Sequence, residues 1–232
     1  MPPRLILALP LLLAACSDGE EAAPVRERDP MAEQALNDNL MTDPDLAGSN
    51  EANAALTGAT DHSLPPVDDS PRAIAAAREE AAEMVGGASR MRALPEPREV
   101  VGEIPATASL SAAARARLVP GAADCADRVE YTAAWAGRMP DALPVYPSGA
   151  TQEAAGTDAT GCALRVVNFL TPVPLEDVLA FYFTRARAAG YSARYVLRDG
   201  DSILDGAKGK ARYAVFARKR DDGLTEIDLV TL

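Results

Sequence analysis

The sequence predicts an α+β fold, in which a small, largely antiparallel sheet carries one main helix on one face in the order β-β-α-β-β-β, preceded by a long disordered arm. Two observations predict it. Every Phe, Tyr and Trp lies after residue 120. The residues that follow contain one amphipathic helical segment between short segments rich in β-forming residues. We therefore divide the chain into a signal peptide (residues 1–15), an arm (16–120) and a globular domain (121–232).

The main helix is predicted at residues 175–189. Glu176 and Asp177 suit the positive N-terminal end of a helix dipole, and Gly190 is a natural terminator. Apolar residues recur at helical spacing on one stripe, namely Leu175, Val178, Leu179, Tyr182, Ala186 and Ala189. This stripe is the face that we expect to pack on the sheet.

Strands are predicted on both sides of this helix. Residues 162–170 are rich in β-formers and end at a proline-containing break, and residues 151–156 precede them as a further strand. The last segment of the chain alternates apolar and polar residues, as a strand with one solvated face does. Turn signals such as Asp-Gly separate the strand candidates after the helix, which lie at 192–197, 202–205, 211–218 and 224–232.

The first residues have the pattern of a secretory signal. Arg4 supplies positive charge, and the apolar residues 5–15 fall short of the about 20 needed to span a membrane. The stretch ends in LAAC, residues 13–16, which resembles the lipobox of bacterial envelope lipoproteins. The resemblance implies that Cys16 becomes an acylated N-terminus that anchors the protein in a lipid bilayer, facing the periplasm. With Ser17 after the cysteine, it implies the outer membrane rather than the inner one.

The arm is acidic as well as free of aromatic residues. Residues 17–120 carry 19 acidic and 9 basic residues, whereas residues 121–232 carry 15 and 13. Such a composition buries too little apolar surface to offset the entropy of ordering, so we expect the arm to be mostly disordered.

Three helix starts are nevertheless present in the arm. Asp29-Pro30, Asp43-Pro44 and Ser70-Pro71 each pair an N-cap residue with proline at the first helical position. Helices this short are marginal alone, so we expect them to form only on a partner. Residues 29–56 are therefore interpreted as a recognition segment for another envelope protein or for the domain itself, or as a tether with incidental helical bias.

The chain has three cysteines. If Cys16 is acylated, Cys125 and Cys162 remain, and the simplest expectation is one disulfide between them. Two buried free thiols or a redox pair are the alternatives, although no C-x-x-C spacing is present.

Several kinds of chemistry are disfavoured. The single histidine, His62, lies in the arm, so the domain has no histidine for a nucleophile triad or a two-histidine zinc site. We expect no metal and no cofactor. The net charge of −11 and the exported location argue against nucleic acid as a partner.

Two groups of residues are candidates for binding. Basic residues gather near one predicted hairpin and suit an anionic partner, namely Lys208, Lys210, Arg212, Arg218, Lys219 and Arg220. Phe181 and Phe183 flank Tyr182 on the main helix, and the three cannot share one narrow stripe, so Phe181 or Phe183 is predicted to line a cavity.

These features predict a non-catalytic, lipid-anchored periplasmic protein that serves as an interaction or binding module. Two alternatives stay open. One is a small-molecule or lipid-binding domain. The other is a carboxylate-dependent envelope hydrolase that uses two of the residues Glu153, Glu176, Asp177, Glu226 and Asp228.

Overall fold

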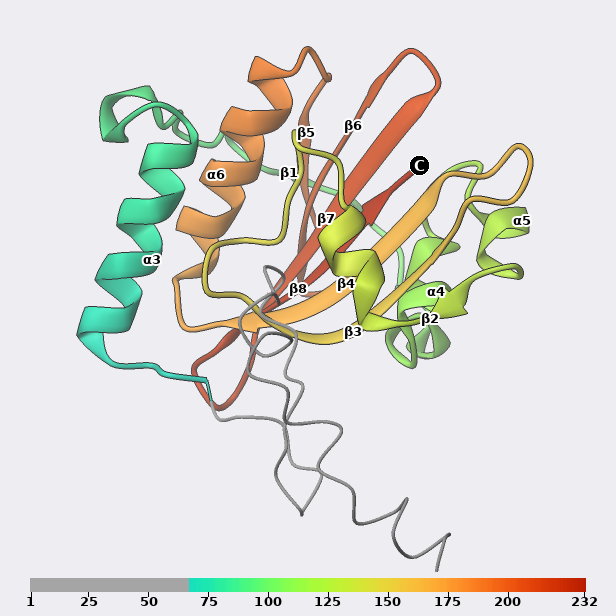
Figure 1. The fold of residues 1–232 in the computed structure, drawn as a ribbon, viewed down its shortest axis with the longest axis horizontal. Coiled ribbons are helices and arrows are strands. Elements are labelled where there is room, and N and C mark those ends of the chain that lie inside the picture. Colours follow the sequence, from blue (N-terminus) through green and yellow to red (C-terminus); the bar gives the residue numbers. More distant parts are fainter. Residues whose placement is uncertain (1–66) are drawn as a thin grey trace, which may run out of the picture. The chain divides into compact units, whose positions relative to one another are not determined.

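The computed structural model describes residues 67–232, and its central feature is an eight-stranded sheet (Figure 1). The strand order is β1-β5-β6-β7-β8-β4-β3-β2. Neighbouring strands are antiparallel except β1 and β5, which are parallel. The strands are β1 (Arg98–Glu99), β2 (Glu130–Tyr131), β3 (Ala150–Thr157), β4 (Leu164–Thr171), β5 (Arg194–Arg198), β6 (Asp201–Lys208), β7 (Ala211–Lys219) and β8 (Thr225–Thr231).

Helices cover both faces of this sheet (Figure 1). One face packs against α6 (Leu175–Ala188), α3 (Pro71–Met84) and the 3-10 helix η3 (Ala133–Arg138). The other packs against α4 (Ala112–Ala116) and α5 (Ala123–Ala126). Two further 3-10 turns are η1 (Ala88–Arg90) and η2 (Ala106–Ser109). The predicted α+β class with a largely antiparallel sheet is confirmed, and the structure adds helices on the second face.

The main helix α6 forms where its stripe of apolar residues predicts it. Val178, Leu179 and Tyr182 are fully buried against the sheet. Tyr182 also donates a hydrogen bond of 2.8 Å to the Pro144 carbonyl oxygen, so its polar end is satisfied inside the core. Gly190, with φ of 85°, follows the last turn and ends the helix.

Each of the predicted strands is present, and four strands follow α6 rather than the three of the predicted order. The extra strand is β6, which the sequence suggested only as a short segment at 202–205. Its C-terminal half contains Gly206, Ala207 and Lys208, which are poor β-formers. The segment is nevertheless extended because it pairs residue by residue with β7.

Residues 67–120 belong to the folded part, so the predicted domain boundary at residue 120 is wrong. The Ser70 hydroxyl accepts a hydrogen bond of 3.2 Å from the Ala73 amide and caps α3. Ala77 and Ala81 of α3 are completely buried in the core that contains α6. Small side chains allow close packing, so this helix needs no aromatic residue of its own. The rest of the arm, including residues 29–56, lies outside the described residues.

Two polar contacts also attach α3 to α6. Arg78 forms an ion pair with Asp177 at the start of α6, with Nη2 2.5 Å from Oδ2. Near the other end, Arg185 donates a hydrogen bond of 2.8 Å to the carbonyl oxygen of Met84. The Ser70-Pro71 helix was expected to form only on a partner, and it packs instead against α6 of the same chain.

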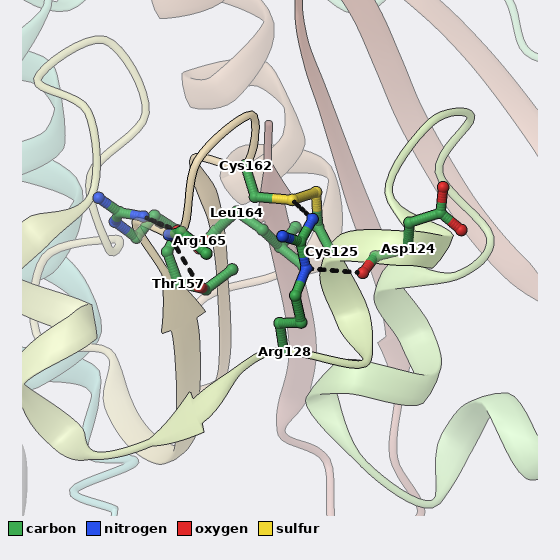
Figure 2. Close-up of a disulfide and its surroundings, with 8 residues drawn as sticks. Asp124, Cys125, Arg128, Thr157, Cys162, Leu164 and Arg165 are labelled. Carbon is green, nitrogen blue, oxygen red and sulfur yellow. Dashed lines mark hydrogen bonds between the residues drawn. A yellow bond between two sulfur atoms is a disulfide. The ribbon is translucent and has the colours of Figure 1, made fainter.

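A disulfide joins Cys125 of α5 to Cys162, which lies just before β4 (Figure 2). The two Cα atoms are 5.6 Å apart, and both side chains are buried. Arg128 lies beside the bridge, with Nη2 2.6 Å from the sulfur of Cys162. The predicted pairing is confirmed, and it fastens α5 to the β3–β4 hairpin.

No helix within residues 67–232 is both long enough and apolar enough to cross a lipid bilayer.

Candidate functional site

The face of the sheet that carries α4 presents side chains in rows, because residues paired across neighbouring strands point to the same side. Three successive rows on β5, β6 and β7 are of interest. They consist of Val196 with Ile203 and Phe216; Arg194 with Asp205 and Ala214; and Ala207 with Arg212. An apolar row therefore lies next to a charged row, and Arg212 lies beyond them at the N-terminal end of β7.

These rows form the floor of a groove with a volume of about 410 Å³. Ligand pockets in proteins typically have about 300–1,000 Å³. One wall is the segment after α4, which contributes Leu118, Val119 and Pro120, and Val100 contributes from the segment after β1. The apolar part of the floor is made by Val196, Ile203, Ala214 and Phe216.

Three arginines and one carboxylate line the groove. Arg194 pairs with Asp205 through two hydrogen bonds of 3.0 and 2.6 Å. Arg198 donates to the carbonyl oxygens of Gly102 and Glu103 at 3.1 and 2.8 Å, which attaches the segment after β1 to β5. The exposed side chain of Arg212 has no hydrogen-bond or ion-pair partner within residues 67–232.

Near Arg212, the loop after α6 approaches β6 very closely. A Cβ atom at Gly206 would lie 1.8 Å from the carbonyl oxygen of Ser192, so only glycine permits this contact. The Ser192 amide donates to the Ala207 carbonyl oxygen at 2.9 Å, and the Tyr213 hydroxyl donates to Ser192 at 3.3 Å. The contact brings Ser192 and Ala193 into the groove lining.

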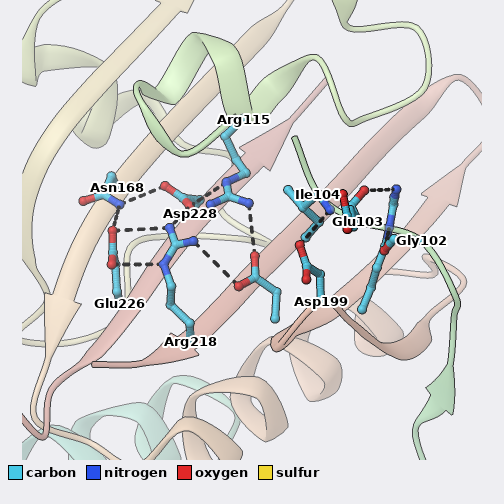
Figure 3. Close-up of polar contacts among 11 residues, drawn as sticks. Gly102, Glu103, Ile104, Arg115, Asn168, Asp199, Arg218, Glu226 and Asp228 are labelled. Carbon is cyan, nitrogen blue, oxygen red and sulfur yellow. Dashed lines mark hydrogen bonds and ion pairs between the residues drawn. The ribbon is translucent and has the colours of Figure 1, made fainter. Parts of the chain in front are cut away.

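A network of buried charges lies beside the groove and holds α4 to the sheet (Figure 3). Arg115 of α4 is 1% exposed, and its guanidinium lies 3.0 Å from Asp201 and 2.9 Å from Asp228. The same guanidinium lies over the ring of Phe216, 5.1 Å from its centroid. Because Phe216 is part of the groove floor, Arg115 connects the network to the groove.

Arg218 of β7 completes this network. It lies 3.0 Å from Asp228 and 3.0 Å from Glu226 (Figure 3). The Asn168 side-chain amide donates to the same two carboxylates, at 2.8 Å to Asp228 and 3.0 Å to Glu226. Two arginines and one amide thus satisfy three carboxylates, which come from β6 and β8.

The pKa values of two carboxyls in the network move in opposite directions. Burial raises the pKa of Asp201, against the opposing effect of Arg218 and Arg115. Burial also acts to raise the pKa of Glu226, but hydrogen bonds from Arg218 and Asn168 outweigh it and lower that pKa. Ionised Glu226 therefore stabilises the fold above its unfolded pKa, and this stabilisation is lost as the pH falls through the lowered folded pKa.

The six basic residues predicted to bind an anionic partner do not form one patch. Lys208, Lys210 and Arg212 lie at the β6–β7 turn, and the other three lie at the far end of the nine-residue strand β7. Of these six, Arg212 lines the groove, and Arg218 belongs to the buried network. Lys208 donates to the Ala189 carbonyl oxygen at 2.8 Å.

Phe181 and Phe183, predicted as candidates for lining a cavity, do not line the groove. Phe181 is 0% exposed and packs edge-on against Tyr146, with ring centroids 5.1 Å apart. Phe183 is half-buried against the same core. Both residues belong to α6 and therefore lie on the side of the sheet opposite the groove. The core on that side is wide enough to bury more than one stripe of α6.

Four of the five carboxylates considered for hydrolysis are engaged in structural contacts, and the fifth, Glu176, is exposed on α6. Asp177 pairs with Arg78, Glu153 accepts from the Ala112 amide at 3.2 Å, and Glu226 and Asp228 belong to the buried network. None of the five candidates lines the groove. Residues 67–232 contain no group of three or more His, Cys, Asp or Glu side chains arranged to hold a metal ion.

Comparisons with protein-family models, with curated proteins and with solved structures give no match. The function of the groove is therefore argued from its own geometry.

Proposed function

We propose that the protein is an exported lipoprotein, anchored in the outer membrane through acylated Cys16, and that its folded part is a non-catalytic module that binds a small apolar or amphipathic ligand in the groove. One observation carries the binding function. The groove has an apolar row in its floor, a volume in the range of ligand pockets, and walls that are already in place. The location rests on the sequence of residues 13–16.

The walls of the groove are fixed in place, and this supports a role for the groove in ligand binding. The wall after α4 is held by the ion pairs of Arg115, and the segment after β1 is held by Arg198. A preformed site loses little conformational entropy when a ligand enters it.

The hydrolase alternative receives no such support. The groove lining includes one carboxylate, Asp205, and it is already paired with Arg194. Hydrolysis of a glycosidic bond by the usual route needs two carboxyl groups on either side of the bond.

Binding in the groove is tested with a substitution that fills its mouth. Ala207 is half-buried, and we expect Ala207→Trp to raise the dissociation constant of a neutral naphthylamine fluorophore about tenfold or more, a loss of about 1.4 kcal/mol. The measurement is a fluorescence titration of the mature chain, residues 17–232, prepared without acylation. Ala188→Trp, an exposed position on α6, is the matched control and should bind as wild type. Equal affinity of Ala207→Trp and wild type would place any binding elsewhere.

The anchor is tested separately. We expect Cys16→Ala to abolish the mass added by fatty acylation and to remove the protein from the washed membrane fraction, because a single point of lipid attachment is being deleted. Intact-mass analysis and membrane fractionation measure the two effects. Retention of Cys16→Ala on washed membranes would contradict the lipoprotein assignment while leaving the groove unaffected.

A further inference from the structure

We infer that the ligand of the groove is a single-chain amphiphile with an anionic head group, a fatty-acid carboxylate, and that Arg212 binds the head group. This inference rests on the proposed function, since it names the ligand class for the same site. It depends on the charge of the groove, on where that charge lies, and on the size of the space.

The groove has an excess of positive charge. Three arginines and one aspartate line it, which leaves two more cations than anions. Asp205 is neutralised by Arg194, and Arg198 donates from two of its guanidinium nitrogens to backbone carbonyl oxygens, which leave its charge uncompensated. Among the lining arginines, Arg212 is the one whose side chain has no hydrogen-bond or ion-pair partner within residues 67–232. Its planar guanidinium can form two parallel hydrogen bonds with a carboxylate.

Arg212 lies at one end of the groove, and the apolar row of Val196, Ile203 and Phe216 lies further along the floor, beyond the row that contains Arg194, Asp205 and Ala214. Arg212 and Phe216 are four residues apart on β7 and point to the same face, a separation of about 13 Å along the strand. Val196 and Ile203 continue the apolar row beside Phe216. A head group at Arg212 would therefore direct its tail towards this row and the wall formed by residues 118–120.

The volume suits one chain. At about 30 Å³ for each water-sized group, the space of about 410 Å³ holds roughly a dozen such groups. A single alkyl chain of medium length fits this space. A head group at Arg212 meets one unpaired guanidinium, because Arg198 lies at the opposite end of the floor, and this favours a carboxylate over a doubly charged phosphate monoester.

The test compares three ligands of equal chain length, each below its critical micelle concentration. Dodecanoate, dodecan-1-ol and dodecyltrimethylammonium are titrated against the mature chain carrying the neutral fluorophore. We expect dodecanoate to displace the fluorophore at a concentration about tenfold lower than dodecan-1-ol, and dodecyltrimethylammonium to be the weakest. The advantage of dodecanoate should shrink as the salt concentration rises, because the head-group contact is exposed.

The variant Arg212→Gln isolates the head-group contact. It should remove the advantage of dodecanoate and leave displacement by dodecan-1-ol unchanged, whereas Lys210→Gln at the same turn, outside the groove lining, should keep the advantage. If dodecan-1-ol and dodecanoate are equivalent in wild type, or if Arg212→Gln keeps the preference, the anion inference fails and groove binding stands. If neither the fluorophore nor dodecan-1-ol binds, the proposed function itself fails.

Discussion

Replacement of Arg115 by methionine is expected to lower the free energy of unfolding by about 3 kcal/mol, because it leaves buried Asp201 and Asp228 without their closest cation. Breaking a buried ion pair from one side typically costs about 3–5 kcal/mol. The lower end applies here, since Arg218 remains 3.0 Å from Asp228 and 3.7 Å from Asp201. Urea denaturation of the mature chain, followed by circular dichroism, measures the change.

The neighbouring arginine provides a matched control. Arg117 follows α4 and pairs with Asp127, but both side chains are largely exposed. Exposed ion pairs contribute about 0–1 kcal/mol, so Arg117→Met should have a small effect. The triple variant Arg115→Met/Asp201→Asn/Asp228→Asn should recover part of the lost stability, because it removes the uncompensated charges together with their partner. An effect of Arg115→Met no larger than that of Arg117→Met would contradict the role of the network.

The second large effect is expected from the disulfide. The double variant Cys125→Ala/Cys162→Ala should lose about 4 kcal/mol, since the bridge closes a loop with a sequence separation of 37 residues and thereby restricts the unfolded chain. Guanidinium denaturation of the mature chain measures the difference.

A reducing agent supplies the control for the bridge. With the bridge reduced, wild type should unfold at the same denaturant concentration as the double variant under non-reducing conditions. If wild type and the double variant unfold together without reducing agent, the bridge does not stabilise the fold.

The elements predicted correctly are those whose ends and faces are set by nearby residues. The helix at 175–188 has acidic residues in its first turn, a glycine after its last, and an apolar stripe between them. The strand β8 also forms as predicted, but the face expected to be solvated is covered, since Asp228 is 5% exposed and Val230 is 0% exposed. The disulfide followed from the parity of the cysteines once Cys16 was assigned to the lipid.

The elements predicted wrongly depend on distant partners. Ala77 and Ala81 lie in an alanine-rich, charged segment that has the composition of a solvated helix, and they are buried because α6 presents a complementary surface. Arg115 is similar, since its carboxylate partners come from β6 and β8, far along the chain. Local composition does not report such docking.

The groove was not predicted for the same reason. Its floor comes from three strands that the sequence identifies only as strands, and its walls come from residues that were assigned to the arm. The signal that was available is the combination of an alternating strand with Arg212 on its Ala214 and Phe216 face. Phe181, one of the two residues predicted as candidates for lining a cavity, is buried in the core because a helix on a wide sheet buries more than a narrow stripe.

The two outermost strands have a consequence for the behaviour of concentrated protein. β1 and β2 are each two residues long, and their side chains, which include Arg98, Glu99 and Glu130, are exposed. Very short edge strands that carry charged side chains disfavour edge-to-edge pairing with a neighbouring molecule. Molecules at high concentration should therefore resist association into fibres through their sheet edges. The residues responsible are those of β1 and β2, which are short enough to resemble connecting loops.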